Sequence, residues 1–217
     1  MKRAPNFDRL ARPYRWMEGL TFGTALRRCR CTYLDQLQSV RNALLLGDGD
    51  GRFLARLLQQ NPAVSVDAVD ASRAMLQALV ENAGPHSVRV RTHYADARQW
   101  DPRTAQYDLV VTHFFLDCLT TEEIADLAAR LRARLHPAAR WIVSDFAIPD
   151  GWLGRLIAQP LVAGLYFCFN VLTGLRVGRL PNHHQALATA NFVLQHESRS
   201  LGGLLVSEIW IPNPAAP

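Results

Sequence analysis

Along most of the chain, short apolar runs alternate with stretches in which apolar residues recur every three or four positions. The short runs are typical of strands buried on both faces of a parallel sheet, and the longer spacing is typical of amphipathic helices. The runs that predict strands are 42–46, 64–70, 88–91, 107–117 and 140–146. Five strands that alternate with helices indicate an α/β fold built on a parallel sheet.

The last part of the chain has a different pattern. Two runs with strand character, 192–196 and 204–211, are separated by a turn around Gly202 and Gly203, with no helix between them. We expect these runs to pair as an antiparallel hairpin. The whole pattern predicts a doubly wound, mainly parallel sheet of seven strands that ends in this hairpin, an ending that is not characteristic of dehydrogenase domains.

The first strand runs into a loop with glycines at alternate positions, Gly47, Gly49 and Gly51, before helical spacing resumes. Glycine lets the backbone turn sharply and approach a ligand closely, and doubly wound sheets bind small molecules beyond the carboxyl ends of their strands. Asp48 and Asp50 place two carboxylates in the loop, so it should repel phosphate and suit a ligand with an ammonium and a sulfonium. The spacing also differs from the G-x-G-x-x-G dinucleotide motif. A strand-to-helix turn without a ligand is the alternative.

Two further acids stand at predicted strand ends. Asp70 ends the second strand, where a carboxylate can accept hydrogen bonds from both hydroxyls of a ribose, and Asp67 competes from inside the strand pattern. Asp96 follows the third strand, where it could accept a hydrogen bond from the exocyclic amine of an adenine, with Ala97 lending backbone contacts. For Asp96, a helix or turn cap is the alternative.

Histidines supply the candidate base. His113 ends the fourth strand and Phe114 follows it. A histidine with a pKa near neutrality is the natural proton acceptor for a hydroxyl or an acidic carbon, so we interpret His113 as the catalytic residue. A hydrogen bond within the loop is the alternative for His113. His183 and His184 follow a Pro-Asn pair in a predicted loop, and we interpret them as a solvated pair.

The charge and the cysteine content bear on which partners, metals and compartment are expected. The net charge of +5 is modest, and the local basic cluster of Arg27, Arg28 and Arg30 has no aromatic residues interleaved, so we expect no nucleic-acid partner. The four cysteines form no zinc pattern, so no metal is expected. Reduced thiols and an N-terminus without a signal peptide favour a cytoplasmic protein.

Residues 156–175 contain no charge. The run is long enough for a membrane span, but it includes polar residues and precedes a hairpin that must return to the same sheet, so no span is predicted. A helix that is apolar on all sides needs a partner on its outer face. We predict a hydrophobic small-molecule acceptor in contact with Tyr166 and Phe169, with a homodimer and peripheral membrane contact as rival uses of the surface.

The chain is predicted to be one domain of 217 residues. Its parts are an N-terminal helical lid at 1–40, a cofactor-binding core at 41–146, an apolar helical insertion at 147–190 and the terminal β-hairpin at 191–217. The first segment precedes the first strand, so its helices are expected to cover the open end of the sheet. Tyr14 and Trp16 are then substrate-pocket residues, together with Phe114 after the fourth strand. Packing on the sheet face is the alternative for Tyr14 and Trp16.

From about Tyr14 to Ile211, these motifs and their order resemble the class I S-adenosylmethionine-dependent methyltransferases, which have a Rossmann-like sheet. Residues 44–51 look like the family's first motif, 68–76 like the second, 96–97 like the adenine-contacting motif, 107–114 like the fourth strand, and the hairpin like the sixth and seventh strands. The resemblance implies S-adenosylmethionine as the cofactor. It implies that Gly47, Asp48, Gly49 and Gly51 surround the methionine moiety, Asp70 the ribose, Ala71 and Met75 the adenine face, and Asp96 and Ala97 the adenine amine.

Methyl transfer from a sulfonium is an in-line displacement that depends mainly on alignment and exclusion of water, so a base is optional. We therefore expect a small-molecule methyltransferase with a lipophilic or aromatic acceptor. One alternative is an NAD-type oxidoreductase on the same sheet, which the acidic loop and the hairpin disfavour. The other is a non-catalytic relative that binds the cofactor or serves as a scaffold.

Overall fold

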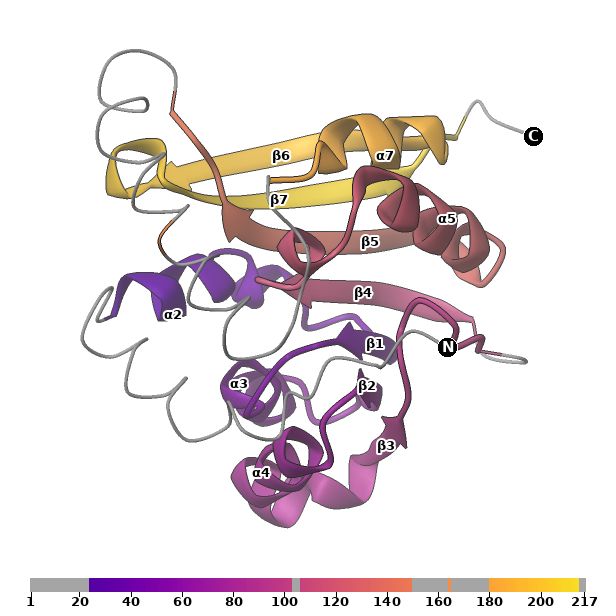
Figure 1. The fold of residues 1–217 in the computed structure, drawn as a ribbon. Coiled ribbons are helices and arrows are strands. Elements are labelled where there is room, and N and C mark those ends of the chain that lie inside the picture. Colours follow the sequence, from indigo (N-terminus) through magenta and orange to yellow (C-terminus); the bar gives the residue numbers. More distant parts are fainter. Residues whose placement is uncertain (1–23, 103–105, 150–163, 165–179, 215–217) are drawn as a thin grey trace.

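The computed structural model describes residues 24–102, 106–149, 164 and 180–214. A seven-stranded sheet in the order β3-β2-β1-β4-β5-β7-β6 forms its centre (Figure 1). The strands are β1 (Asn42–Leu46), β2 (Ser65–Asp70), β3 (Val90–Tyr94), β4 (Tyr107–His113), β5 (Leu135–Phe146), β6 (Phe192–Ser200) and β7 (Leu205–Pro212). Neighbours among β1 to β5 pair in parallel, whereas β7 is antiparallel to β5 and to β6. The predicted doubly wound sheet with a C-terminal hairpin is confirmed.

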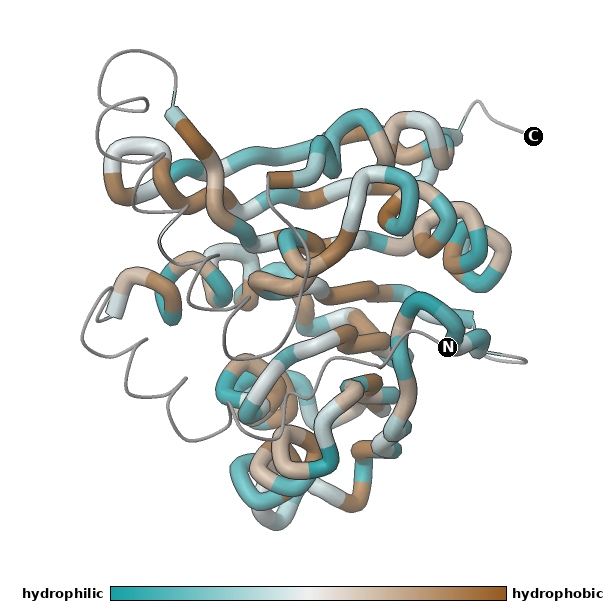
Figure 2. The backbone as a smooth tube through the Cα atoms, viewed as in Figure 1, coloured by the Kyte–Doolittle hydropathy of each residue, from teal (hydrophilic) through white to brown (hydrophobic). Residues whose placement is uncertain are grey.

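Helices cover both faces of the sheet. They are α2 (Ala25–Arg30), α3 (Arg52–Gln60), α4 (Arg73–Ala83), α5 (Thr121–Arg132) and α7 (His183–Thr189). In β1, Ala43 and Leu45 pack with α3 and α4, while Leu44 and Leu46 pack with α5 and α7. This double burial explains the continuous apolar run at the first strand. In Figure 2 the central strand β4 is mostly brown, whereas the edge strand β6 is mostly teal.

Local capping fixes where the helices begin. Thr120 accepts a hydrogen bond from the backbone N–H of Glu123, whose carboxylate accepts one from the Thr120 N–H in return, so a capping box opens α5. Ser72 caps α4 by accepting a hydrogen bond from the Met75 N–H. Gly51 precedes α3 in a left-handed conformation. These caps place the first turns of α3 and α4 next to the carboxyl ends of β1 and β2.

Several strand boundaries differ from the prediction, among them the end of β6, which continues to Ser200 rather than ending at residue 196. The third strand begins at Val90 rather than at residue 88, because Val88 is 89% exposed and the Arg89 side chain donates to the carbonyl oxygens of Leu58 and Asn61. The fourth strand ends at His113 rather than at residue 117, since the next residue turns away with a φ of 53°. The fifth strand is longer than predicted and begins at Leu135.

Parts of two predicted segments lie outside the described residues. These include the substrate candidates Tyr14 and Trp16 of the lid and Tyr166 and Phe169 of the apolar segment. The described end of the lid segment contains α2, which packs on β7 through Leu26, Cys29 and Leu205. None of the helices in the described part of the chain has the length and apolar character needed to cross a bilayer. The division into lid, core, insertion and hairpin remains a prediction.

Candidate active site

The glycine loop joins β1 to α3 and has a backbone that side chains rarely allow. Gly47, Gly49 and Gly51 have φ angles of 64°, 62° and 76°. A Cβ atom on Gly47 would lie 2.4 Å from the Phe115 ring, and one on Gly51 would lie 2.8 Å from Cγ of Leu79. A Cβ on Gly49 would meet no described atom within 4 Å. Gly49 is therefore the position in this loop at which the backbone faces open space.

The Asp48 side chain is turned inward, and its contact with the cofactor stays a prediction. Its side chain is 2% exposed, and its Oδ2 accepts a hydrogen bond from the Leu54 N–H at 3.2 Å. Its Oδ1 lies 3.5 Å from Nδ1 of His113. A carboxylate at the first turn of a helix also interacts favourably with the helix dipole. In this arrangement the Asp48 carboxylate connects the loop to the first turn of α3.

His113 is buried beneath the same loop. Its side chain is 1% exposed, and its ring stands edge-on to Phe53 with 4.5 Å between ring centroids. Neither ring nitrogen makes a hydrogen bond with the described residues. Burial lowers the pKa of His113, and the nearby Asp48 carboxylate only partly offsets this effect, so the neutral imidazole is favoured.

Phe114 follows His113 with a φ of 53°, and its ring packs 5.1 Å from that of Phe146 at the end of β5. The Arg30 guanidinium lies 5.2 Å from the centre of the Phe114 ring. Phe115 packs on Gly47, as described above. Aromatic side chains therefore gather where β4 and β5 end, beside the glycine loop.

Asp70 stands at the carboxyl end of β2, as predicted. Its Oδ1 accepts a hydrogen bond from the Ser72 N–H at 2.8 Å, and its carbonyl oxygen accepts one from the Ala95 N–H. The Gly47 N–H donates to the carbonyl oxygen of Val69, which brings the glycine loop next to this strand end. The loop and Asp70 are thus neighbours on the same edge of the sheet.

The remaining adenine candidates follow β2 and β3. Ala71 is half-buried between β2 and α4, while Met75 is 9% and Ala97 is 6% exposed. The Asp96 carboxylate accepts hydrogen bonds from the Arg98 guanidinium, with 2.6 Å between Oδ2 and Nη2, and from the Arg98 N–H. The turn-capping alternative for Asp96 is thus observed. A carboxylate has about four acceptor sites, so these hydrogen bonds leave room for one from an adenine amine. That contact stays a prediction.

A surface cavity of about 550 Å³ adjoins this turn and is lined by Ala95, Asp96, Gln99, Trp100 and Asp101. Asp67, the competing ribose candidate, is buried in the interior of the sheet. The Asp67 side chain is 6% exposed and binds Arg91, His93 and Tyr107. These contacts give Asp67 a structural role in the sheet.

Comparison with known proteins agrees with this geometry. Residues 43–138 match a family model described as a methyltransferase domain. The match spans less than half of the 217 residues, so it identifies a methyltransferase-like domain within residues 43–138. None of the curated protein sequences matches the chain.

Solved methyltransferase structures share the fold. The mitomycin 7-O-methyltransferase MmcR has a TM-score of 0.68 at 16% identity, covering 95% of this chain and 60% of that chain. The S-adenosylmethionine-dependent methyltransferase SibL, in its apo form, has a TM-score of 0.69 at 19% identity, covering 98% and 63%. The CcbJ methyltransferase from Streptomyces caelestis has a TM-score of 0.65 at 18% identity, covering 85% and 88%. The chain thus spans less than two thirds of the length of MmcR and SibL.

A pair of buried acids, Asp117 and Asp145, lies where β4 and β5 end, and the sequence pattern did not single it out. Asp145 accepts hydrogen bonds from the N–H groups of Asp117 and Phe146. Burial, reinforced by the neighbouring Asp117 carboxylate, raises the pKa of Asp145 well above its ordinary value. The position of Asp145 near the end of the fifth predicted strand, equivalent to that of Asp70 on the second, is the signal that could have found it.

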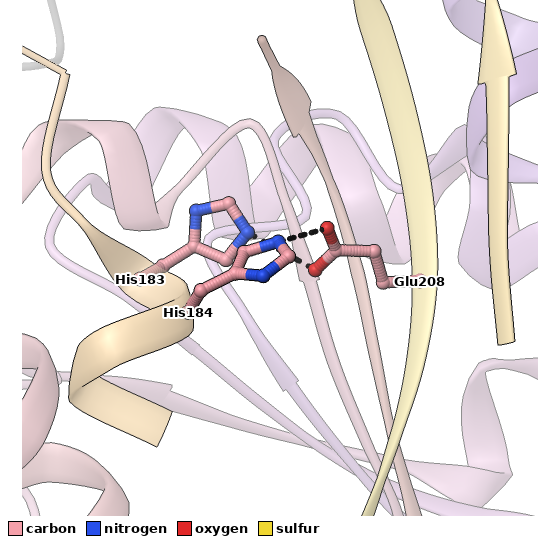
Figure 3. A group of neighbouring side chains, drawn as sticks. All are labelled: His183, His184 and Glu208. Carbon is pink, nitrogen blue, oxygen red and sulfur yellow. Dashed lines mark hydrogen bonds and ion pairs between the residues drawn. The ribbon is translucent and has the colours of Figure 1, made fainter. Parts of the chain in front are cut away.

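The interpretation of His183 and His184 as a solvated pair is wrong. Both rings point at the carboxylate of Glu208 on β7 (Figure 3), with Nε2–oxygen distances of 3.0 Å for His183 and 2.7 Å for His184. The Trp210 indole N–H also donates to this carboxylate. Burial alone would raise the pKa of Glu208, but these hydrogen bonds lower it to about 2. His184 and Glu208 are 24 residues apart in the sequence, so a local pattern could not predict this contact.

Proposed function

We propose that this chain transfers a methyl group from S-adenosylmethionine to a small lipophilic or aromatic acceptor. The observation that carries the proposal is the loop between β1 and α3, in which glycines with positive φ leave the backbone open at Gly49. Such a loop allows a ligand to approach the main chain closely. The loop also lies within the part of the chain that matches the methyltransferase domain.

The loop backbone from Gly47 to Gly51 would hold the methionine moiety, and the Asp70 carboxylate would accept hydrogen bonds from the ribose hydroxyls. Ala71 and Met75 would face the adenine, with Asp96 and Ala97 toward its amine. Two observations support this arrangement: the hydrogen bond from Gly47 to β2 and the one from Ala95 to the Asp70 carbonyl oxygen. They keep the loop, Asp70 and the turn after β3 close together. The inward position of the Asp48 carboxylate favours its main chain as the contact.

When bound, S-adenosylmethionine would supply a methyl group that is attached to a sulfonium sulfur. The acceptor atom would attack the methyl carbon in line with the carbon–sulfur bond, and the sulfur would leave as a neutral thioether. The residues around it then contribute alignment and exclusion of water. For a hydroxyl acceptor, a ring nitrogen of His113 would take the proton, and its lowered pKa and lack of hydrogen bonds with described residues support this role. Its 1% exposure favours the alternative that His113 positions the loop through Asp48 and Phe53.

The aromatic side chains at the ends of β4 and β5 support an aromatic acceptor. Phe114 and Phe146 pack together there, and Phe115 lies against the glycine loop. Flat apolar molecules pack well against such rings. The apolar segment 156–175 would extend this wall, and a homodimer or contact with a membrane surface are its rival uses. We propose a cytoplasmic location for the same small-molecule chemistry.

Binding of the reaction product tests the proposal. S-adenosylhomocysteine should raise the melting temperature of the purified chain, because a ligand that binds the folded state stabilises it, and NADH should not. Asp70→Ala should weaken S-adenosylhomocysteine binding in calorimetry by about 1–3 kcal/mol, since the ribose hydroxyls lose a charged acceptor. Asp126→Ala, on the exposed side of α5, is the control and should bind normally.

Stabilisation by NADH alone would instead support the oxidoreductase. Binding of S-adenosylhomocysteine without methyl transfer to any hydroxyl, amine or carbon acceptor would support the non-catalytic relative. An unchanged affinity in Asp70→Ala would remove Asp70 from the site while leaving the family assignment intact.

A further inference from the structure

The cluster of His183, His184 and Glu208 has the composition and spacing of a metal site. One nitrogen from each histidine and one carboxylate oxygen lie within 4.8 Å of one another. In a tetrahedral zinc site with bonds of about 2.0–2.2 Å, neighbouring ligand atoms are roughly 3.3 Å apart. The observed Nε2–oxygen distances of 3.0 Å and 2.7 Å are close to that value. Small side-chain rotations would therefore open the space for an ion.

The three side chains are held in place from outside the cluster. His183 and His184 are the first two residues of α7, and the Asn182 side chain caps that helix by accepting a hydrogen bond from the Gln185 N–H. The Asn182 N–H donates to the Thr121 hydroxyl at the start of α5. On β7, the Trp210 indole N–H donates to Oε2 of Glu208 at 2.7 Å. A carboxylate ligand that is itself hydrogen-bonded in this way is typical of metal sites.

The electrostatics of Glu208 favour a bound cation. Its side chain is 0% exposed, and a buried carboxylate is costly unless a positive group compensates it. In the described part of the chain, Glu208 forms ion pairs with these two histidines and with no lysine or arginine. A divalent ion held by the three side chains would neutralise this buried carboxylate.

The cluster is also accessible. The side chain of His183 is 12% exposed and that of His184 is 43% exposed, so an ion can reach the cluster from the solvent side. Figure 3 shows the two rings side by side on α7, facing the carboxylate on the strand. Three protein ligands would leave a fourth position for water or another small ligand.

We propose that His183, His184 and Glu208 bind a divalent transition-metal ion of the zinc class. Two imidazoles and one carboxylate suit zinc, nickel or copper, whereas magnesium and calcium prefer oxygen ligands. On binding, each histidine would offer its Nε2 lone pair and carry its proton on Nδ1. This site is separate from the glycine loop and does not depend on the proposed methyl transfer.

Metal titration of the chelator-treated, dialysed chain tests the proposal. We expect one saturable site for zinc chloride in calorimetry, a rise in melting temperature with zinc, and the visible absorption of tetrahedral cobalt with cobalt chloride. His183→Gln and His184→Gln keep a hydrogen-bond donor near Glu208 but lose the imidazole, and each should lower zinc affinity at least tenfold. Trp210→Phe removes the donor that orients the carboxylate and should lower it about 10–100-fold.

His86→Gln is the matched control, because this histidine lies in the turn Gly84–Arg89 beside β3, at the opposite edge of the sheet from β6. Its zinc affinity should equal that of the unmodified chain. Circular dichroism and melting in the absence of metal check that every variant folds. Absence of saturable binding, or an unchanged zinc affinity in His184→Gln, would overturn the proposal and leave the cluster as a hydrogen-bonded contact between α7 and β7.

Discussion

Gly47 and Gly49 have nearly the same backbone conformation, with φ angles of 64° and 62°, but different surroundings. A side chain on Gly47 would collide with the Phe115 ring, whereas one on Gly49 would enter open space. Left-handed strain costs about 1–2 kcal/mol for either alanine variant. We therefore expect Gly47→Ala to lose more unfolding free energy than Gly49→Ala in urea denaturation.

For cofactor affinity we expect the opposite order, with a larger loss in Gly49→Ala than in Gly47→Ala. If the ligand approaches the main chain at Gly49, Gly49→Ala should lose affinity for S-adenosylhomocysteine by more than its loss of stability explains. Calorimetry on both variants measures this. Equal stability losses would show that Phe115 moves aside, and normal binding by Gly49→Ala would place the ligand elsewhere.

His113 has two competing roles with different kinetic signatures. As a base for a hydroxyl acceptor, His113→Asn should slow turnover about 10²–10⁴-fold and remove the pH dependence that the imidazole causes. Because burial lowers its pKa, that dependence should lie below the usual histidine value of about 6.5, with activity falling at acidic pH. As a positioning residue, His113→Asn should instead lower stability and cofactor affinity while the pH profile keeps its shape.

At the scale of elements, Asp67 connects three strands. It lies on β2 and accepts hydrogen bonds from Arg91 and His93 on β3 and from Tyr107 on β4. Burial would raise the pKa of Asp67, but these hydrogen bonds outweigh it and lower the pKa below its ordinary value. The contribution to stability is therefore present above the unfolded pKa of about 3.9 and is lost as pH falls toward the folded value.

Asp67→Asn should lower the free energy of unfolding by about 1–3 kcal/mol at pH 7 and make stability less sensitive to acid between pH 5 and 3. Urea denaturation across this range provides the measurement. Asp126→Asn on the surface of α5 is the matched control. A variant that loses stability equally at pH 7 and pH 3 would show that the Asp67 charge is not responsible.

The elements that local pattern determines could be predicted from the sequence. The apolar run at 42–46, the glycine loop and the turn at Gly202 and Gly203 carry their signals within a few positions, and the structure has them where expected. The position of Val88 could not be predicted, because the Arg89 side chain closes a turn by binding carbonyls about thirty residues away. Local propensity does not contain that contact.

Side-chain directions at the site were harder to predict than the elements. Asp48 turns inward because the start of α3 offers it the Leu54 N–H, and His183 and His184 turn toward β7 because strand register places Glu208 opposite them. Both outcomes depend on packing between elements. The position of Asp70 at the end of a strand, in contrast, could be predicted from the strand pattern of the sequence.

At the scale of the whole molecule, the complete seven-stranded sheet is present in a chain that spans 60% of MmcR and 63% of SibL. The chain nevertheless matches CcbJ over 88% of that protein's length. The sheet and its helices therefore correspond to most of the length of CcbJ. An acceptor site beside this sheet, as proposed above, would need apolar residues that close it off from water.

The apolar segment 156–175 is the candidate for that closure, and its two uses make different predictions. If it lines an acceptor pocket, Tyr166→Ala and Phe169→Ala should raise the KM for a phenolic probe such as 1-naphthol about tenfold or more, because each removes buried aromatic area. The chain would then be monomeric in size-exclusion chromatography with light scattering. If it forms a dimer interface, the unmodified chain should be dimeric and the same variants should dissociate. Val193→Ala, on exposed β6, is the control for both readouts. A monomer whose two variants retain the full affinity for the probe contradicts both uses, because the segment would then contact neither an acceptor nor a second copy.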